Sequence, residues 1–153
     1  MFGLDDKQIN FRKATIDDVN QIWLVERASF PTPWTKEAFI KELTDNRLAH
    51  YFVLELGNQI IGYAGMWIIL DEAHITNVAI HPETRGRKLG ELLMRNLMTM
   101  AKLFGAKKMT LEVRESNRIA LNLYCKLDFK RQGIRKKYYT NPIEDAIIMW
   151  VKL

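Results

Sequence analysis

The middle of the chain constrains the fold most, because it combines signals for a β-hairpin with signals for a strand-helix-strand unit. We predict strands at residues 49–56, 59–69, 73–80 and 107–113, and a helix at residues 89–104. Gly57 and Asn58 form a two-residue hairpin turn signal between the first two strands. The apolar residues of the helix recur at helical spacing, and Gly105 favours its end. A hairpin joins antiparallel strands and a helical crossover joins parallel ones, so the sheet must be mixed.

The two ends of the chain extend the same pattern. We predict a strand at 9–14 and helices at 15–29 and 35–45 before the hairpin, and a helix from residue 116 or 117 and strands at 129–139 and 145–152 after the central unit. Thr15 with Asp18, and Thr35, supply N-terminal caps for the first two helices. No repeat, low-complexity tract or flexible linker interrupts the 153 residues. We therefore expect one domain, residues 1–153, of the α/β (α+β) class, with helices covering a mixed sheet.

Composition excludes several classes of protein. No run of the chain approaches the roughly 20 apolar residues of a membrane-spanning helix. Asp5 and Asp6 stand where a secretory signal would have a basic start, and the single Cys125 cannot form an internal disulfide, so we expect a cytoplasmic protein. Cysteine and histidine show no zinc-ligand spacing, so we predict no metal site. A net charge of +5 is modest, and a solvated strand face explains the basic segment 130–137, so direct nucleic-acid binding is not predicted.

The loop that leads from strand 73–80 into helix 89–104 carries the first chemical signal. Its sequence from His81 to Gly90 is HPETRGRKLG, with two glycines and three basic side chains. Backbone N–H groups and the positive end of the helix dipole converge at such a junction, and glycine lets the backbone approach a phosphate closely. An anion site explains these residues, and so do turn geometry and solubility.

This loop resembles the signature of the GNAT superfamily of N-acetyltransferases, in which Gln or Arg is followed after two residues by Gly and after one more by Gly or Ala. Arg85 and Gly90 match the two ends, and Lys88 stands at the middle glycine position. Lys88 keeps its backbone N–H. The phosphate cradle therefore survives if the backbone at this position adopts a conformation that is open to residues other than glycine.

Further motifs sharpen the resemblance, to the RimI-type family of ribosomal-protein-alanine N-acetyltransferases. They are LEVRESN at 111–117, ALNLY at 120–124, Asp128-Phe129, Tyr138-Tyr139 and DAIIM at 145–149, which with the Arg85 loop cover nearly the whole chain. The resemblance implies the GNAT acyl-CoA N-acyltransferase fold, a mixed, mostly antiparallel central sheet flanked by about four helices. It also implies acetyl-CoA as the cosubstrate.

The same resemblance implies which residues serve catalysis and the cosubstrate. Glu112 would be the general base, and Tyr124, twelve positions later, the general acid. Residues implied to hold acetyl-CoA are Val78, Ala79 and Ile80 at the acetyl and pantetheine groups, Arg85, Gly86, Arg87, Lys88, Leu89, Gly90 and Glu91 at the pyrophosphate, and Asn117.

The implied acceptor is a protein N-terminus, the N-terminal alanine of a small-subunit ribosomal protein. The resemblance places it between the loop that carries Trp34 and the strand end that carries Tyr138 and Tyr139. Glu72 and His74 begin the strand beside the thioester site, so either could orient the amine or relay a proton through water.

Each role has a structural alternative. Glu112 lies on the opposite face of its strand from Met109, Leu111 and Val113, where a solvent-facing carboxylate is ordinary. Packing explains Tyr124 on the apolar stripe of its helix, and a helix cap explains Asn117. For the whole protein, the alternatives are a ribosome- or RNA-binding module that kept the fold without the chemistry, and an acetyltransferase for lysine or small-molecule amines.

Overall fold

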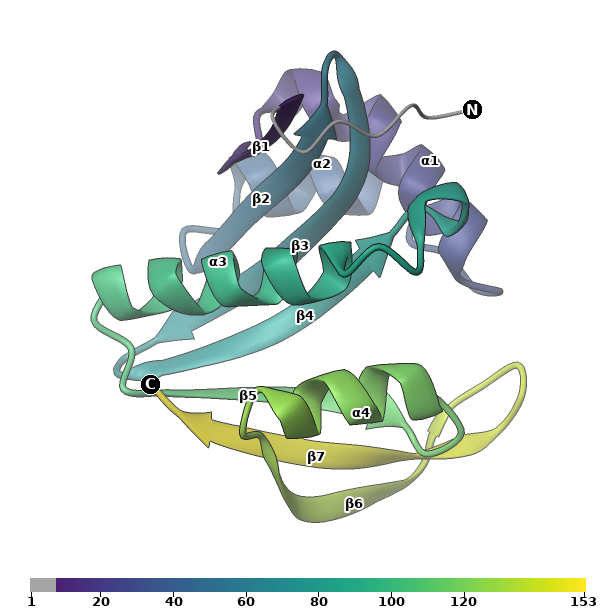
Figure 1. Cartoon of the computed structure of the whole chain (residues 1–153), viewed down its shortest axis with the longest axis vertical. Helices are drawn as coiled ribbons and strands as arrows, with labels where there is room; N and C mark the ends of the chain where they lie inside the picture. Colours follow the sequence, from purple (N-terminus) through teal and green to yellow (C-terminus); the bar gives the residue numbers. More distant parts are fainter. Residues whose placement is uncertain (1–7) are drawn as a thin grey trace.

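The computed structural model describes residues 8–153, which form one seven-stranded sheet in the order β1-β2-β3-β4-β5-β7-β6 (Figure 1). The strands are β1 (Ile9–Lys13), β2 (Ala49–Leu56), β3 (Gln59–Ile69), β4 (Glu72–Ile80), β5 (Lys108–Arg114), β6 (Lys130–Tyr139) and β7 (Glu144–Lys152). All neighbouring pairs are antiparallel except β4 and β5, which are parallel. The predicted mixed, mostly antiparallel sheet is confirmed. The acidic pair Asp5 and Asp6 lies outside the described residues.

Four α-helices lie in the described part of the chain, as predicted. They are α1 (Val19–Ser29), α2 (Lys36–Thr44), α3 (Leu89–Leu103) and α4 (Arg118–Lys126). Thr35 caps α2 by accepting a hydrogen bond from the N–H of Ala38 at 3.2 Å. The capping interaction between Thr15 and Asp18 also forms, but it opens a 3₁₀ turn at Ile16–Asp18, so α1 begins later than predicted. None of the helices among residues 8–153 is long and apolar enough to cross a membrane.

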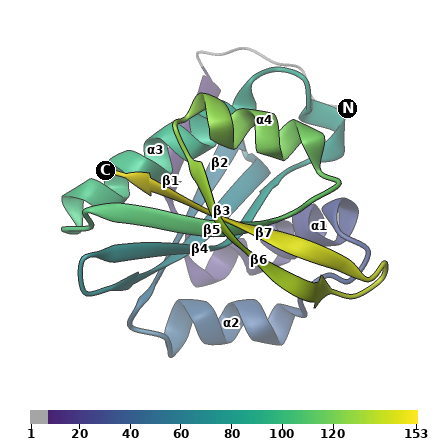
Figure 2. The same ribbon diagram turned by 90° about the horizontal axis from the view of Figure 1, so that it is seen from below.

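Helices cover the sheet on both faces (Figures 1 and 2). Helices α3 and α4 bury one face, where the predicted apolar row of β5, Met109, Leu111 and Val113, packs in the larger core. Helices α1 and α2 bury the other face against β2, β3 and β4, in a second core that includes Phe39 and Tyr63. Glu112 therefore points away from the larger core, as the alternation of β5 predicted.

The sheet opens between its two halves. Strand β4 pairs with β5 only from Glu72 to His74, opposite Lys108 to Thr110, and the remaining residues of both strands diverge (Figure 1). A register irregularity between β3 and β4 at Gly65/Met66 leaves Thr76 as an extra residue in β4. The backbones of β4 and β5 therefore diverge as a wedge, and the separation between the two strands is widest at the end where α3 begins, which we call the open end (Figure 1).

Candidate functional site

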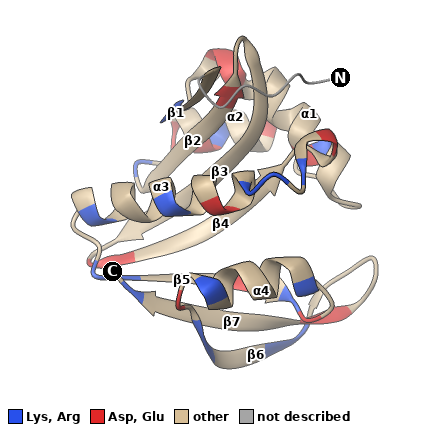
Figure 3. Cartoon of the chain, in the orientation of Figure 1, with Lys and Arg blue, Asp and Glu red and all other residues tan. Residues whose placement is uncertain are grey.

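One side of the open end is the loop between β4 and α3. Residues 85–88 are exposed, and in Figure 3 the loop carries a blue run of Lys and Arg. Nε of Arg85 donates to the carbonyl oxygen of Ile80 at 3.1 Å, which ties the loop to the end of β4. Within residues 8–153, the N–H groups of residues 86–91 form no backbone hydrogen bond; the first is from Leu92 to Lys88. These donors and the positive end of the helix dipole give the loop the geometry that the predicted anion site requires, and we call residues 86–91 the anion cradle.

The backbone of this loop accommodates Lys88. Lys88 has φ 61 and ψ 21, which is the left-handed helical region, and Gly86 has a φ of 82. The left-handed region costs a residue with a Cβ about 1–2 kcal/mol but remains open to it. Lysine at the middle glycine position of the signature is therefore tolerated, with its N–H in place.

Gly90 and Glu91 join α3 to α4. A Cβ on Gly90 would lie 3.5 Å from Cδ2 of Leu123, an ordinary contact between the two helices. The Glu91 carboxylate accepts from Nζ of Lys126 at 2.6 Å and Nε of Arg95 at 2.9 Å, and these two cations lower the pKa of Glu91. The side chain of Glu91 thus braces the helices while its backbone belongs to the cradle.

Strand β4 ends beside the cradle with Val78, Ala79 and Ile80. Strand β3 pairs with one edge of this segment. The other edge faces the wedge and, among the described residues, has no strand partner because β5 pairs only as far as His74. Apart from the Ile80 carbonyl oxygen, which accepts from Arg85, the backbone groups on that edge are available to an extended ligand such as pantetheine.

Glu112 faces the site from β5. Nε of Arg135, on β6, donates to its Oε1 at 3.1 Å, and the Glu112 side chain keeps 29% of its surface exposed. Tyr138 lies next to it: burial, the charge of Glu112 and a hydrogen bond to Glu112 raise the pKa of Tyr138. The carboxylate is thus held in place but remains open to solvent and to an incoming amine.

Tyr124 lies on α4 and packs against Phe129, with 5.7 Å between ring centroids. Burial raises the pKa of its hydroxyl to about 12, so the group is protonated at neutral pH. Burial also raises the pKa of Tyr139, and the negative forms of Tyr138, Glu112 and Tyr124 add to this rise. Tyr139 therefore lies within electrostatic range of both predicted catalytic residues.

The connection between β6 and β7 is fixed to the start of α4. The Glu144 carboxylate accepts from the N–H of Ser116 at 2.6 Å and from Arg114 at 3.2 Å, and the Arg114 guanidinium lies 4.4 Å from the Tyr139 ring centroid. Asn117 caps α4 by accepting from the N–H of Ala120 at 3.2 Å. The helix-cap role of Asn117 is confirmed, and a contact with coenzyme A stays a prediction.

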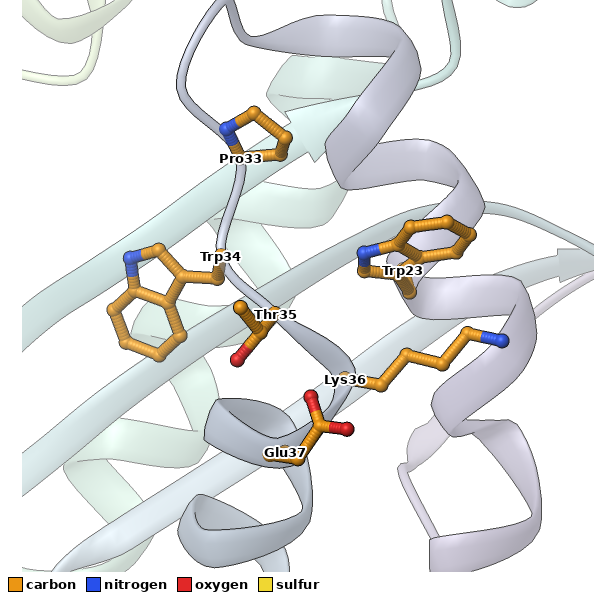
Figure 4. A pocket seen from close by; sticks show the side chains of 6 residues that line it. All are labelled: Trp23, Pro33, Trp34, Thr35, Lys36 and Glu37. Carbon is orange, nitrogen blue, oxygen red and sulfur yellow. The ribbon is translucent and has the colours of Figure 1, made fainter.

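Trp34 lies in the loop between α1 and α2. The Trp34 ring packs on Phe39 with 5.4 Å between ring centroids, and the backbone N–H of Trp34 donates to Oε2 of Glu26 at 2.9 Å. A hollow of about 360 Å³ beside it is lined by Trp23, Pro33, Trp34, Thr35, Lys36 and Glu37 (Figure 4). Figures 1 and 2 both place this loop, the start of α3 and the β6–β7 connection at one end of the molecule, around the open wedge.

Glu72 and His74 lie at the closed end of the wedge, where β4 and β5 pair. The Glu72 carboxylate bonds to Nε2 of His74 at 3.0 Å and to Nζ of Lys108 at 3.2 Å. The four residue-to-residue steps from His74 to Val78 span about 13 Å of extended strand. The structure therefore does not bring Glu72 and His74 together with Val78 at the end of β4.

Comparison with known proteins agrees with this geometry. The model of the acetyltransferase (GNAT) family matches residues 18–129. A Bacillus subtilis (strain 168) protein provisionally named ribosomal protein bS18-alanine N-acetyltransferase is 46% identical over 142 residues, which are 93% of this chain and 94% of that protein.

Two solved structures share the fold. The crystal structure of the ribosomal-protein-S18-alanine N-acetyltransferase from Escherichia coli superposes with a TM-score of 0.87, at 29% identity, covering 94% of this chain and 93% of that one. A GNAT family acetyltransferase from Elizabethkingia anophelis, solved with acetyl-CoA bound, has a TM-score of 0.78 at 23% identity over 97% of this chain and 100% of its own. With its cradle, wedge and LEVRESN strand, this chain belongs to the GNAT family of acetyltransferases, in the RimI-type group of ribosomal-protein-alanine N-acetyltransferases.

Proposed function

We propose that this protein transfers the acetyl group of acetyl-CoA to the α-amino group of the N-terminal alanine of ribosomal protein bS18, in the cytoplasm. The names of its relatives support this acceptor. The strongest structural support is the wedge, which has the anion cradle on one side and Glu112 with Tyr138 and Tyr139 on the other.

The described residues fit acetyl-CoA. The free N–H groups of residues 86–91 would hold its pyrophosphate, and the unpaired edge of Val78, Ala79 and Ile80 would hold pantetheine and the acetyl group. When bound, acetyl-CoA supplies an activated acetyl thioester. Asn117, at the neighbouring start of α4, can contact the same molecule beside its capping bond.

Glu112 suits the role of general base. An amine attacks a carbonyl only without its proton, and the exposed Glu112 carboxylate can accept that proton directly or through water. An α-amino group has a pKa of about 7.7–8.0 and lysine about 10.4, so freeing lysine at neutral pH costs roughly 3.4 kcal/mol more. Proton chemistry therefore favours a chain terminus over a lysine side chain.

Tyr124 suits hydrogen-bond donation to the departing sulfur. Its pKa of about 12 lies about 3.5 units above that of an ordinary thiol, near 8.5, so complete proton transfer to the thiolate is uphill by roughly 5 kcal/mol. Donation without transfer still stabilises the charge that develops on sulfur. We assign the acid role to Tyr124 in this sense.

Coenzyme A release tests the proposal. Purified protein is given acetyl-CoA and a peptide with the bS18 N-terminus, beside the same peptide with a blocked N-terminus. We expect release only with the free terminus, and mass spectrometry should place the acetyl group on the alanine. Acetylation of the blocked peptide at lysine would instead establish a lysine acceptor, and binding of acetyl-CoA without turnover of either peptide would refute the acceptor assignment.

A further inference from the structure

The acidic side chain of Glu26 on α1 is buried in the second core. The residue is 2% exposed and lies among the apolar residues that α1 packs against the sheet. Burying a carboxylate costs several kcal/mol unless partners compensate for the lost water. Within residues 8–153, no Lys, Arg or His forms an ion pair with Glu26. The compensation must come from hydrogen bonds.

Two hydrogen bonds satisfy the two oxygens of Glu26. The hydroxyl of Tyr63, on β3, donates to Oε1, and the backbone N–H of Trp34 donates to Oε2 at 2.9 Å. Tyr63 is fully buried. In this buried setting, breaking either bond would leave a polar group without a partner and without water, so both Trp34 and Tyr63 are held firmly.

The bond from Trp34 anchors the loop between α1 and α2. Pro31 and Pro33 have no N–H to donate. Among the described residues, the Trp34 N–H makes the one hydrogen bond that joins residues 31–34 to the rest of the chain. Without Glu26, packing of the Trp34 ring on Phe39 would be left to hold this loop.

The bond from Tyr63 extends the link to the wedge. Tyr63 pairs with Ala79 across β3 and β4, and the Asn77 side chain is near enough to its hydroxyl to offset part of the rise in the pKa of Tyr63. The hydroxyl oxygen of Tyr51 lies 3.3 Å from Oδ1 of Asn77 and 3.2 Å from Oγ1 of Thr76, within hydrogen-bonding distance of both. Glu26 is therefore connected, through the buried Tyr63, to residues 77–79 of β4, which lie beyond the part of β4 that pairs with β5.

We propose that Glu26 is a positioning residue for the acceptor: it fixes the Trp34 loop, one wall of the acceptor site, relative to residues 77–79 of β4, beside the thioester position. This inference rests on the proposed function, which places the acceptor next to Trp34. The amine must approach the carbonyl carbon at a defined distance and angle. Both depend on the position of the Trp34 loop relative to residues 77–79 of β4. Glu26 touches neither reactant, and it acts through Trp34 and Tyr63.

The chemistry of glutamine separates positioning from proton transfer. Glu26→Gln removes the charge, but its amide oxygen can accept from the Trp34 N–H while its NH₂ donates to the Tyr63 oxygen, since a phenol both donates and accepts. Glu26→Ala removes both bonds. A positioning role predicts that Glu26→Gln keeps most activity, whereas a base or proton relay at Glu26 would be lost in both variants.

Glu42 offers a matched control. Its carboxylate also accepts from a tyrosine hydroxyl and a tryptophan N–H, from Tyr51 at 3.0 Å and from Nε1 of Trp67 at 2.7 Å. It lies on α2 and has no bond to the 31–34 loop in the described structure. Glu42→Ala should therefore cost stability as Glu26→Ala does, while the hydrogen bond from the Trp34 N–H to Glu26 stays in place.

The test compares the three variants of the full chain with the wild type. For Glu26→Ala we expect faster hydrogen exchange at the Trp34 amide and a KM for the bS18 peptide raised about 10-fold or more, the effect of one lost charged hydrogen bond, with acetyl-CoA affinity within about 3-fold. Glu26→Gln and Glu42→Ala should keep the Trp34 protection and the peptide KM.

Three results would overturn the proposal. These are equal loss of acetyl-CoA and peptide affinity in Glu26→Ala, loss of activity in Glu26→Gln that matches Glu26→Ala, and a Trp34 amide that exchanges no faster in Glu26→Ala. If the alanine variant does not fold, Tyr63→Phe keeps the Trp34 bond but removes the link from Glu26 to β3 and β4, so the peptide KM should rise while the Trp34 amide stays protected, and an unchanged KM would count against the proposal. Hydrogen exchange needs no turnover, so failure of the wild type on the bS18 peptide would refute the proposed function alone.

Discussion

The left-handed backbone of Lys88 predicts that the chain is more stable with glycine at this position than with alanine. A φ of 61 and ψ of 21 cost a residue with a Cβ about 1–2 kcal/mol. Glycine does not incur this cost, but its greater conformational freedom in the unfolded chain lowers the free energy of unfolding by about 0.5–1 kcal/mol. Lys88→Gly should therefore exceed Lys88→Ala by about 0.5–1 kcal/mol in the free energy of unfolding, or about 1–4 °C in Tm.

Both variants lose the lysine charge, so the comparison isolates the backbone. Urea and thermal unfolding without cosubstrate measure the difference, and titration with acetyl-CoA measures binding. Affinity should fall to the same extent in both, because each variant keeps the N–H at position 88 and loses the same cation near the pyrophosphate. If Lys88→Ala proves the more stable variant, the backbone is not left-handed here, and our reason why lysine can replace the signature glycine is wrong.

The remaining predictions concern catalysis, the cradle and acid stability. Glu112→Gln should lower kcat about 10²–10⁴-fold at neutral pH with an unchanged Kd for acetyl-CoA, because only proton transfer is removed; equal losses would indicate a structural residue. Tyr124 has a pKa of about 12, so the wild type and Tyr124→Phe should show the same pH profile of kcat between pH 6 and pH 10 at different heights, and a basic limb present only in the wild type would contradict this. Gly90→Glu should abolish acetyl-CoA binding measured by calorimetry, since it adds bulk and a carboxylate at the pyrophosphate. Gly90→Ala, whose Cβ would lie 3.5 Å from Leu123, should bind acetyl-CoA normally. Normal binding by Gly90→Glu would show that the pyrophosphate site lies elsewhere. Hydrogen bonds from Arg12 hold the pKa of Asp18 below 3.8, so this pair stabilises the fold above that pH and the stabilisation disappears as pH falls further. Asp18→Asn should flatten the fall in the free energy of unfolding between pH 5 and pH 2.5, and an unchanged slope would show that the pair does not contribute.

Local pattern was enough to predict the helices and strands. Alternation in β5 and helical spacing in α3 are set by which face is buried, and both follow from a few residues in sequence. Thr35 and Asn117 cap the helices expected of them because capping involves only the next three residues. The first turn after Thr15 differs, since Asp18 is also held by Arg12 from a strand outside the helix, a contact that local pattern does not contain.

Distances along and between strands were harder to predict. Glu72 and His74 share a strand with Val78, and sequence proximity made them candidates for the same site. An extended strand separates side chains by more than 3 Å per residue, so four to six positions place them at the closed end of the wedge. The divergence of β4 from β5 likewise depends on where pairing stops, at His74 and Thr110, which no single segment encodes. The geometry of the wedge is a property of the assembled sheet.

Glu26 shows what a pattern can reveal and what it cannot. It follows Val19 and Ile22 on the buried face of α1, and an acidic residue in an apolar stripe is a signal that sequence alone contains. Its partners are not visible there: Tyr63 lies 37 residues away on β3, and the Trp34 bond uses a backbone N–H that any residue would offer. A buried carboxylate is tolerated only when such partners converge on it, so the fold must bring them there before Glu26 can fix the acceptor wall. A site residue of this kind is found through its burial and its bonds, because it needs no motif of its own.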